Sequence, residues 1–373
     1  MFEKYLTNIN KNSTIAIYGT NYFALNIYND LKAYYPDIKI IFISDDTNDN
    51  CIKDEKLYAL CDFINIKSSV SLVIIASRNK LFETKEFLSY FNISYKIPSK
   101  EDEIFFKVEK YFEKQKLALD IFENKEDKTL YNIQWESICS GDYQGSEKYA
   151  KKAHNISRYN LSRNYSKQYL EFINKDAIKN MIDGGFCNGI NSFVFRREFK
   201  NLEKIYAYEP LYEKFKNKNY DPFIKNDNRI EIIPKCLWSN SCDIEFCENQ
   251  TYNSASRVFG TRWTNYIKPT ENIQTIPAVS IDDEKIRLNL PKIDFIKLDV
   301  EGSEQEVLKG AYKTIEKDRP QLAISIYHTI ADFIEIPLYL KNTLENYTFH
   351  LGHYSYDLLE TVIYAIPKEL LKS

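Results

Sequence analysis

The stretch "MIDGGFCNGINS" at residues 181–192 decides the fold expected for the larger part of the chain. It begins with apolar residues typical of a buried strand and passes through an acid into a run that contains three glycines. A strand that ends in this way and continues into a helix is typical of a nucleotide-like cofactor site, because glycine permits a tight turn and the first N–H groups of the helix are unpaired. The turn alone does not identify the cofactor.

The acid distinguishes this turn from the turn of nicotinamide-dependent enzymes. Those enzymes use GxGxxG to place a pyrophosphate on the helix N-terminus, whereas only Gly185-x-x-x-Gly189 follows Asp183 here. A carboxylate repels a diphosphate but suits the ammonium group of S-adenosylmethionine. Glu209 ends the next strand in "YAYEP" and would accept hydrogen bonds from ribose hydroxyls, as in NAD enzymes. The pair of acids favours S-adenosylmethionine over the alternative that both are ordinary polar residues at strand ends.

A second stretch, "KLDVEGSE", follows an apolar run in the same half of the chain. Its residues Lys297, Asp299 and Glu301 alternate, so we expect them on one side of a strand or its exit loop. Ser303 is placed to cap the next helix, and Glu304 would lie in the first turn, where the helix dipole favours an acid. Asp299 and Glu301 would lie at the carboxyl end of a central strand, where doubly wound folds bind ligands.

Six blocks in this order and spacing resemble the FkbM family of S-adenosylmethionine-dependent methyltransferases over roughly residues 165–367: "MIDGGFCNGINSFVF", "IYAYEP", "VSIDD", "IDFIKLDVEGSEQEVLKGA", "RPQLAISIYH" and "IP" at 336–337. The resemblance implies an O-methyltransferase that acts on a sugar or another small-molecule hydroxyl, often in polysaccharide biosynthesis. The chain departs from the common methyltransferase pattern at Cys187, where many members have a third glycine. The residues that we expect to bind the cofactor are Asp183, Gly184, Gly185, Asn188, Gly189, Glu209, Pro210, Cys236, Leu237 and Asp299.

Methyl transfer is an in-line displacement, so alignment and exclusion of water are the main tasks of the protein. A hydroxyl acceptor also benefits from a base within hydrogen-bond reach. The candidate catalytic residues are Lys297, Asp299, Glu301 and His328, and the candidate substrate-binding residues are Glu301, Glu304 and His328. Alternatives stay open: His328 could be structural and Lys297 a paired strand charge. The acids and the histidine are metal-ligand types, but their spacing requires no metal and we expect none.

The alternation of apolar runs and helical patterns predicts an α/β protein. We expect a doubly wound Rossmann-like methyltransferase sheet at 166–373, mostly parallel, with "YTFHLGHY" and "TVIYAIP" as an antiparallel hairpin at its edge. A smaller N-terminal Rossmann-like domain at 1–100 and a helical connector at 101–165 complete the expected architecture. The spacing of apolar residues in "EQEVLKGAYKTIEKD" predicts a helix over 304–318.

The N-terminal part contains a similar but weaker glycine turn, "IAIYGTNYFA" at 15–24, between strand-like runs at 14–19, 38–46 and 71–77. It would bind a nucleotide or nucleotide sugar, with Asp45 or Asp46 near a ribose. The alternative is a degenerate module for docking or dimerisation. Rival functions for the whole chain are a nicotinamide-dependent sugar enzyme that uses this turn and a non-catalytic scaffold.

The amino-acid composition limits the kinds of partner that the protein can be expected to bind. The formal net charge of −3 gives no attraction to nucleic acid, and no run of about 18 apolar residues predicts a membrane span. Seven cysteines without a CxxC pair, and no signal-like N-terminus, favour reduced thiols and a cytoplasmic location. We therefore expect a small-molecule or saccharide acceptor. The identity of the acceptor and any homo-oligomer stay open.

Overall fold

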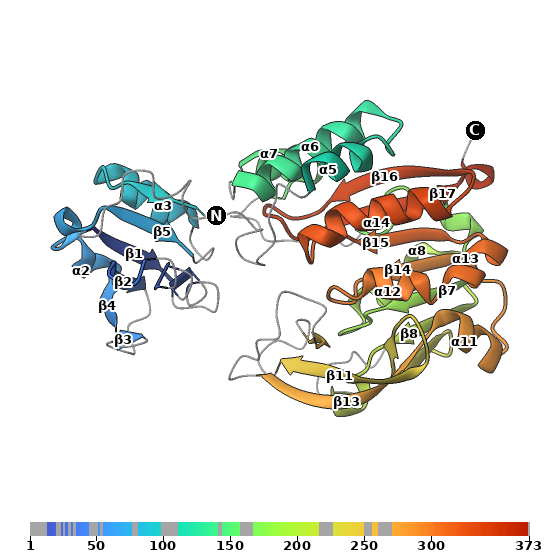
Figure 1. Ribbon diagram of the computed structural model, residues 1–373. Helices are drawn as coiled ribbons and strands as arrows, with labels where there is room; N and C mark the ends of the chain where they lie inside the picture. Colours follow the sequence, from blue (N-terminus) through green and yellow to red (C-terminus); the bar gives the residue numbers. More distant parts are fainter. Residues whose placement is uncertain are drawn as a thin grey trace. The chain divides into compact units, whose positions relative to one another are not determined.

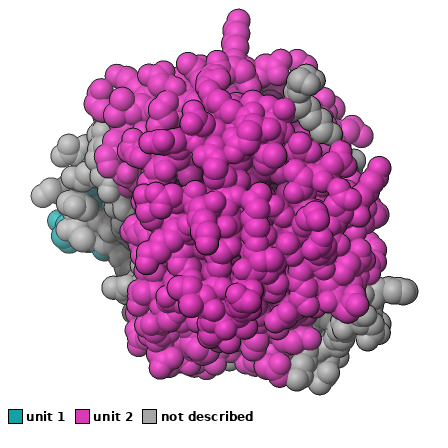
Figure 2. All heavy atoms as spheres, turned by 90° about the vertical axis from the view of Figure 1, so that its right-hand side faces the viewer, with its two compact units in different colours: residues 1–107, 138–142 teal, residues 108–137, 143–373 magenta. Residues whose placement is uncertain are grey.

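The computed structural model describes residues 13–19, 24, 27–28, 31–32, 35–44, 51–52, 55–76, 81–97, 111–140, 144–156, 167–215, 227–249, 256–259 and 271–371. These residues group into two compact units, one formed by Met1–Lys107 with Ile138–Asp142 and the other by Val108–Ser137 with Tyr143–Ser373. Figure 1 labels the helices and strands, and Figure 2 colours the two units.

The first unit is an α/β sheet. Its strands are β1 (Thr14–Tyr18), β2 (Lys39–Ser44), β3 (Cys51–Ile52), β4 (Glu55–Ala59), β5 (Leu72–Ile75) and β6 (Tyr95–Lys96), in the order β3-β4-β2-β1-β5-β6. All neighbours pair in parallel except β3 and β4. The described helices are α2 (Leu60–Phe63) and α3 (Leu81–Tyr90). The three expected strands are present, because continuous β-branched runs suit strands buried on both faces. Asp45 and Asp46 lie outside the described residues.

The second unit is built on a seven-stranded mixed sheet in the order β16-β17-β15-β14-β7-β8-β9. Its strands are β7 (Asn180–Gly184), β8 (Lys204–Tyr208), β9 (Ile230–Ile233), β14 (Phe295–Leu298), β15 (Gln321–Ser325), β16 (Tyr347–His353) and β17 (Thr361–Pro367). The five strands from β9 to β15 pair in parallel, and β16 and β17 pair antiparallel at the edge. The carboxyl ends of the parallel strands therefore meet along one edge of the sheet.

Helices cover both faces of this sheet (Figure 1). They are α8 (Ile190–Glu198), α9 (Tyr212–Phe215), α11 (Ile281–Arg287), α12 (Glu304–Lys309), α13 (Tyr312–Asp318) and α14 (Ile330–Thr343). One long helix was expected at 304–318, but the helix breaks at Gly310. A Cβ atom there would lie 2.3 Å from the carbonyl oxygen of Trp238, so the backbones approach too closely for any other residue. The break lets α12 and α13 follow the sheet separately.

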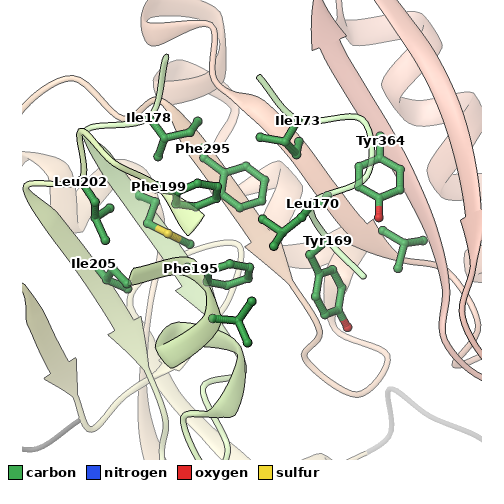
Figure 3. Packing of buried hydrophobic residues seen from close by; sticks show 14 of the residues in the cluster. Tyr169, Leu170, Ile173, Ile178, Phe195, Phe199, Leu202, Ile205, Phe295 and Tyr364 are labelled. Atoms are coloured by element: carbon green, nitrogen blue, oxygen red, sulfur yellow. The ribbon is translucent and has the colours of Figure 1, made fainter. Parts of the chain in front are cut away.

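A large apolar cluster lies between α8, the sheet and the segment before β7 (Figure 3). Phe195 and Phe199 stack with their ring centroids 5.6 Å apart, and both meet Phe295 edge to face. Burial of one phenylalanine side chain contributes about 1.5–3 kcal/mol, so this cluster fixes α8 and the turn that precedes it. Tyr169 lies at the edge of the same cluster.

A separate four-stranded sheet follows β9. Its strands are β10 (Cys236–Leu237), β11 (Cys242–Asn249), β12 (Arg257–Val258) and β13 (Glu271–Val279), in the order β10-β13-β11-β12. The run "IEIIPKCLW" at 230–238 predicts a single strand, but this prediction is wrong, since β9 and β10 belong to different sheets. Residues 242–248 form the expected strand but pair with β13, which lies outside every strand range expected from the sequence. Alternation of polar and apolar residues in "ENIQTIPAV" gives a weak strand signal.

Three helices, α5 (Phe112–Leu119), α6 (Lys125–Ser140) and α7 (Gln144–His154), precede β7 in the chain. Tyr131 of α6 stacks on Phe333 of α14 with ring centroids 4.5 Å apart, and Lys114 of α5 pairs with Glu335. These contacts belong to the second unit. Of the helical connector expected at 101–165, residues 101–110, 141–143 and 157–165 lie outside the described part of the chain. Among the described residues, no helix has the length and apolar character needed to cross a membrane.

Candidate active site

The glycine turn leaves β7 and enters α8 with three residues at positive φ, Gly185, Cys187 and Gly189. Gly185 has φ 81°, and a Cβ atom on it would lie 1.8 Å from the carbonyl oxygen of Asp299. Cys187 has φ 50°, a conformation that disfavours any residue with a Cβ atom. A glycine at this position would adopt the same conformation without that strain. Asn188 is exposed and accepts the N–H of Ile190, and Gly189 caps α8 with φ 79°.

Glu209 faces this turn from the end of β8. Its Oε2 accepts the N–H of Cys187 at 2.8 Å, and its Oε1 accepts the N–H of Leu211 at 3.0 Å. The residue and the neighbouring Pro210 are half-buried. Burial raises the pKa of the Glu209 carboxyl to about 7, although both N–H groups and Lys297 act in the opposite direction. The carboxylate is therefore fixed, partly accessible and close to titration at neutral pH.

Asp183 and Lys297 form a completely buried ion pair. They are cross-strand neighbours in β7 and β14, with Lys297 Nζ 3.0 Å from Asp183 Oδ1. Lys297 also donates to the carbonyl oxygens of Gly184 and Gly185, and Ser192 of α8 donates to Asp183 Oδ2 at 2.5 Å. Burial would lower the pKa of Lys297, but the carboxylates of Asp183 and Asp299 hold it above its usual value. The pair ties the glycine turn to the central strand.

Asp299 follows β14 on the same edge of the sheet. Two tyrosine hydroxyls donate to its carboxylate, Tyr169 to Oδ2 at 2.9 Å and Tyr327 to Oδ1 at 3.0 Å. Burial alone would raise the pKa of Asp299, but Lys297, His328 and the hydroxyls of Tyr169 and Ser325 outweigh it and bring the pKa to about 2. The side chain is 20% exposed, so an ionised carboxylate is accessible at this edge.

Glu304 and His328 lie behind this carboxylate, and both are buried without exposed surface. Glu304 accepts the N–H groups of Val300 and Gly302 at 2.8 and 3.0 Å, and its Oε1 lies 2.9 Å from His328 Nδ1. Glu304 thereby closes the turn before α12. Ser303 occupies the expected cap position, but its side chain makes no capping hydrogen bond.

The other nitrogen of His328 faces two carboxylates. Its Nε2 lies 3.4 Å from Asp299 Oδ1 and 3.8 Å from Glu301 Oε2. Glu301 has φ 57°, in the left-handed region, and its side chain is 20% exposed. Within the described part of the chain, Asp299, Glu304 and His328 offer ligand atoms within 4.8 Å of one another, as a divalent cation would need.

The expected site residues therefore divide into two groups. Lys297, Asp299, Glu301, Glu304 and His328 form one connected cluster with Asp183, whereas Glu209 lies with the glycine turn. Cys236 and Leu237, expected beside the adenine, are buried in β10, and Leu237 contacts the turn at Gly184. Sequence reasoning missed Tyr169 and Tyr327. Tyr327 directly precedes His328 at a strand end and could have been considered, but Tyr169 has no motif around it.

A doubly wound sheet with a glycine turn, an acid at the second strand end and an acidic turn after the central strand defines a Rossmann-like domain of the methyltransferase class. The family model described as "Methyltransferase FkbM domain" matches residues 183–351. This part of the chain therefore belongs to the FkbM methyltransferase family.

Known structures extend the similarity in fold. The crystal structure of methyltransferase FkbM from Methylobacillus flagellatus KT superimposes with a TM-score of 0.66 over 97% of this chain and 92% of that chain, at 16% sequence identity. A Haemonchus contortus phosphoethanolamine N-methyltransferase 2, solved with phosphomonomethylethanolamine and S-adenosylhomocysteine, gives a TM-score of only 0.21 at 10% identity over 91% and 76% of the two chains. No curated protein matches the sequence.

Proposed function

We propose that the protein is an S-adenosylmethionine-dependent O-methyltransferase that acts on a hydroxyl of a sugar or another small molecule, in polysaccharide or glycan biosynthesis. The observation that carries the proposal is the carboxylate of Glu209, held by two backbone N–H groups opposite the glycine turn. The FkbM domain at residues 183–351 supports methyl transfer as the reaction.

The residues fit an adenosine cofactor without phosphates. Each Glu209 oxygen accepts one backbone N–H and keeps a further lone pair, which suits two ribose hydroxyls. The turn from Gly185 to Gly189 opens α8 without GxGxxG, and the partly exposed carboxylate of Asp299 places negative charge next to it. Such a surface favours a sulfonium cofactor that carries an ammonium group. When bound, that cofactor would supply an activated methyl group.

The acidic cluster suits deprotonation of an acceptor hydroxyl. Glu304 orients His328 through Nδ1, as the acid does in a nucleophile–histidine–acid arrangement, and leaves Nε2 toward Asp299 and Glu301. Asp299 is a weak base, because its pKa is about 2. His328 has no exposed surface, so we assign the contact with the acceptor to Glu301 and let His328 accept the proton behind it. Lys297 and Glu304 are assigned to holding the two turns.

Cofactor binding is tested by substituting Glu209 and, as a control, a nearby surface glutamate. Glu209→Ala should weaken binding of S-adenosylhomocysteine at least tenfold in calorimetry, because two charge-assisted hydrogen bonds to the ribose are lost. Glu231→Ala is the control, since Glu231 lies on the adjacent β9 and pairs only at the surface with Lys204. Equal affinity of wild type and Glu209→Ala would contradict the assignment of Glu209.

The test of the base replaces His328. His328→Ala should reduce turnover by a larger factor than it reduces S-adenosylhomocysteine affinity. Full turnover would exclude His328 as proton acceptor. We also propose that no metal ion is required. Loss of activity on chelation and its recovery with a divalent cation would contradict that statement and would assign a ligand role to Asp299, Glu304 and His328.

A further inference from the structure

We propose that Asp299, and not Asp183, receives the ammonium group of the cofactor, and that Tyr169 and Tyr327 are positioning residues for the Asp299 carboxylate. This inference rests on the proposed function, because it assigns a subsite for the amino-acid part of S-adenosylmethionine. The evidence for it is that Asp183 and Asp299 lie at the same edge of the sheet but differ in burial and in hydrogen-bond partners.

Both oxygens of the Asp183 carboxylate already interact with side chains of the protein. It has no exposed surface, its Oδ1 lies 3.0 Å from Lys297 Nζ, and its Oδ2 accepts the hydroxyl of Ser192. Lys297 in turn donates to two carbonyl oxygens of the glycine turn. A ligand ammonium could reach Asp183 only by displacing Lys297, which would leave a second buried cation without its partner.

Asp299 lies next to the same turn and is accessible. Its N–H donates to the carbonyl oxygen of Gly184 at 3.0 Å, and its own carbonyl oxygen abuts Gly185. The side chain is 20% exposed and ionised at neutral pH. The carboxylate that is accessible beside the glycine turn is therefore that of Asp299, which follows β14. It is not that of Asp183, which precedes the turn on β7.

The two tyrosines fix the orientation of that carboxylate. Tyr169 donates to Oδ2 and Tyr327 to Oδ1, so one phenol holds each oxygen, and a carboxylate with about four acceptor positions keeps capacity for a further N–H donor. Tyr169 holds φ 64°, in the left-handed region, although its side chain is completely buried. Such a conformation costs about 1–3 kcal/mol and persists only where packing imposes it. The ring packs against Leu170 and Tyr364 in the apolar cluster (Figure 3), which provides that packing.

Besides the two tyrosines, the groups that act on the Asp299 carboxylate are Lys297, His328 and the hydroxyl of Ser325. Lys297 lies close enough to lower its pKa but is paired with Asp183, and its Nζ lies 5.4 Å from the centre of the Tyr169 ring. His328 Nε2 approaches Oδ1 at 3.4 Å from the buried side. An external cation therefore meets an anionic carboxylate from the exposed side.

A pair of ligands separates this subsite from the rest of the cofactor site. S-adenosylhomocysteine and 5′-methylthioadenosine share adenosine and a thioether, but only the former carries an ammonium and a carboxylate. Asp299→Asn should weaken S-adenosylhomocysteine at least tenfold in calorimetry and 5′-methylthioadenosine less than twofold. Removing the charge of Asp299 would also remove its repulsion of the ligand carboxylate, which by itself would strengthen binding. A selective loss of S-adenosylhomocysteine affinity must therefore come from the lost contact with the ammonium group.

The tyrosine variants test positioning without removing the charge. Tyr169→Phe and Tyr327→Phe should each weaken S-adenosylhomocysteine about three- to tenfold and spare 5′-methylthioadenosine, because a carboxylate that loses a hydrogen bond is held less firmly toward the ligand ammonium. Tyr347→Phe is the control, since its hydroxyl bonds the carbonyl oxygen of Pro320 far from the site. It should leave both affinities unchanged.

Three results would overturn the inference. Asp299→Asn could weaken both ligands equally, a folded Asp183→Asn could show the selective loss instead, or the tyrosine variants could leave the ratio of the two affinities unchanged. The first two contradict the ammonium assignment and the third contradicts the positioning role. If the folded wild type bound neither ligand, the proposed function itself would fail, which is a distinct result.

Discussion

At the scale of single residues, the buried ion pair of Asp183 and Lys297 is the interaction of the site with the clearest structural role. Both side chains have no exposed surface, and together they join β7, β14 and the glycine turn. We predict that Asp183→Asn or Lys297→Met alone lowers the free energy of unfolding by about 3–5 kcal/mol, because each leaves a buried charge without its partner. Urea unfolding measures this loss.

The double variant provides the control for that prediction. Asp183→Asn combined with Lys297→Met should be clearly more stable than the sum of the two single losses predicts, since it removes both charges. Additive losses would show that the two groups do not depend on each other.

Glu209 gives a prediction of pH dependence. Its pKa of about 7 in the free protein means that the carboxyl is partly protonated at neutral pH, whereas ribose hydroxyls donate to the ionised form. Affinity for S-adenosylhomocysteine should therefore rise between pH 6 and 8, and binding near pH 7 should release a proton. Calorimetry in buffers of different ionisation enthalpy measures that proton. Glu209→Gln should remove the dependence, and its persistence in this variant would assign it to another group.

The sequence predicts where the acidic residues of the site lie in the sheet. It does not predict which side chains they bind. Asp183, Glu209 and Asp299 follow strand ends in motifs, so their place on one sheet edge follows from the α/β pattern. Nothing in the sequence pairs Asp183 with Lys297 or brings Tyr169 to Asp299 across 130 residues. Tyr169 is one of 29 tyrosines, and its role depends on a backbone conformation that no motif marks.

At the scale of elements, the helices before β7 protect the edge strand of the large sheet. Asp127 of α6 accepts the N–H of Leu351 on β16 at 3.0 Å and lies 3.0 Å from His350 Nδ1. Asn124 caps the same helix through the N–H of Asp127. An edge strand with unpaired backbone groups is a site of aggregation, so this cover has a clear physical role.

We predict that Asp127→Ala lowers the free energy of unfolding by about 2 kcal/mol, because the N–H of Leu351 and the ring of His350 lose their acceptor. Glu126→Ala is the matched control, since Glu126 is exposed in the same turn. Denaturant unfolding of both variants measures the difference. Equal stability of the two would show that Asp127 does not anchor α6 to β16.

Strands with continuous apolar runs could be predicted, and strands with mixed patterns could not. β7, β8, β14, β15 and the closing hairpin lie where the apolar pattern indicates them, because both faces of the sheet are covered. β13 alternates polar and apolar residues and belongs to a small sheet whose pairing depends on distant segments. The break at Gly310 is set by the backbone of Trp238, which is also distant in sequence.

At the scale of the whole molecule, the chain forms two units with separate apolar cores, and all three tryptophans, Trp135, Trp238 and Trp263, fall in the sequence ranges of the second. Tryptophan fluorescence therefore reports the methyltransferase unit alone. A ligand at one hundred times its dissociation constant stabilises the unit that binds it by about 2.7 kcal/mol.

We predict that S-adenosylhomocysteine raises the melting temperature seen by fluorescence and leaves unchanged any transition that circular dichroism assigns to the N-terminal unit. Units with their own cores are expected to unfold separately. Thermal melts recorded with both probes, with and without ligand, measure this. A single transition that shifts by the same amount for both probes would show that the units unfold together.

The measurement that tests the central claim most directly is a calorimetric titration of the folded, full-length protein with S-adenosylhomocysteine, with NADH titrated in parallel. The edge formed by Glu209, the glycine turn and Asp299 predicts saturable one-site binding of S-adenosylhomocysteine that is unaffected by NADH. Binding of NADH alone, or of neither compound, would contradict the assignment of this edge as a site for S-adenosylmethionine.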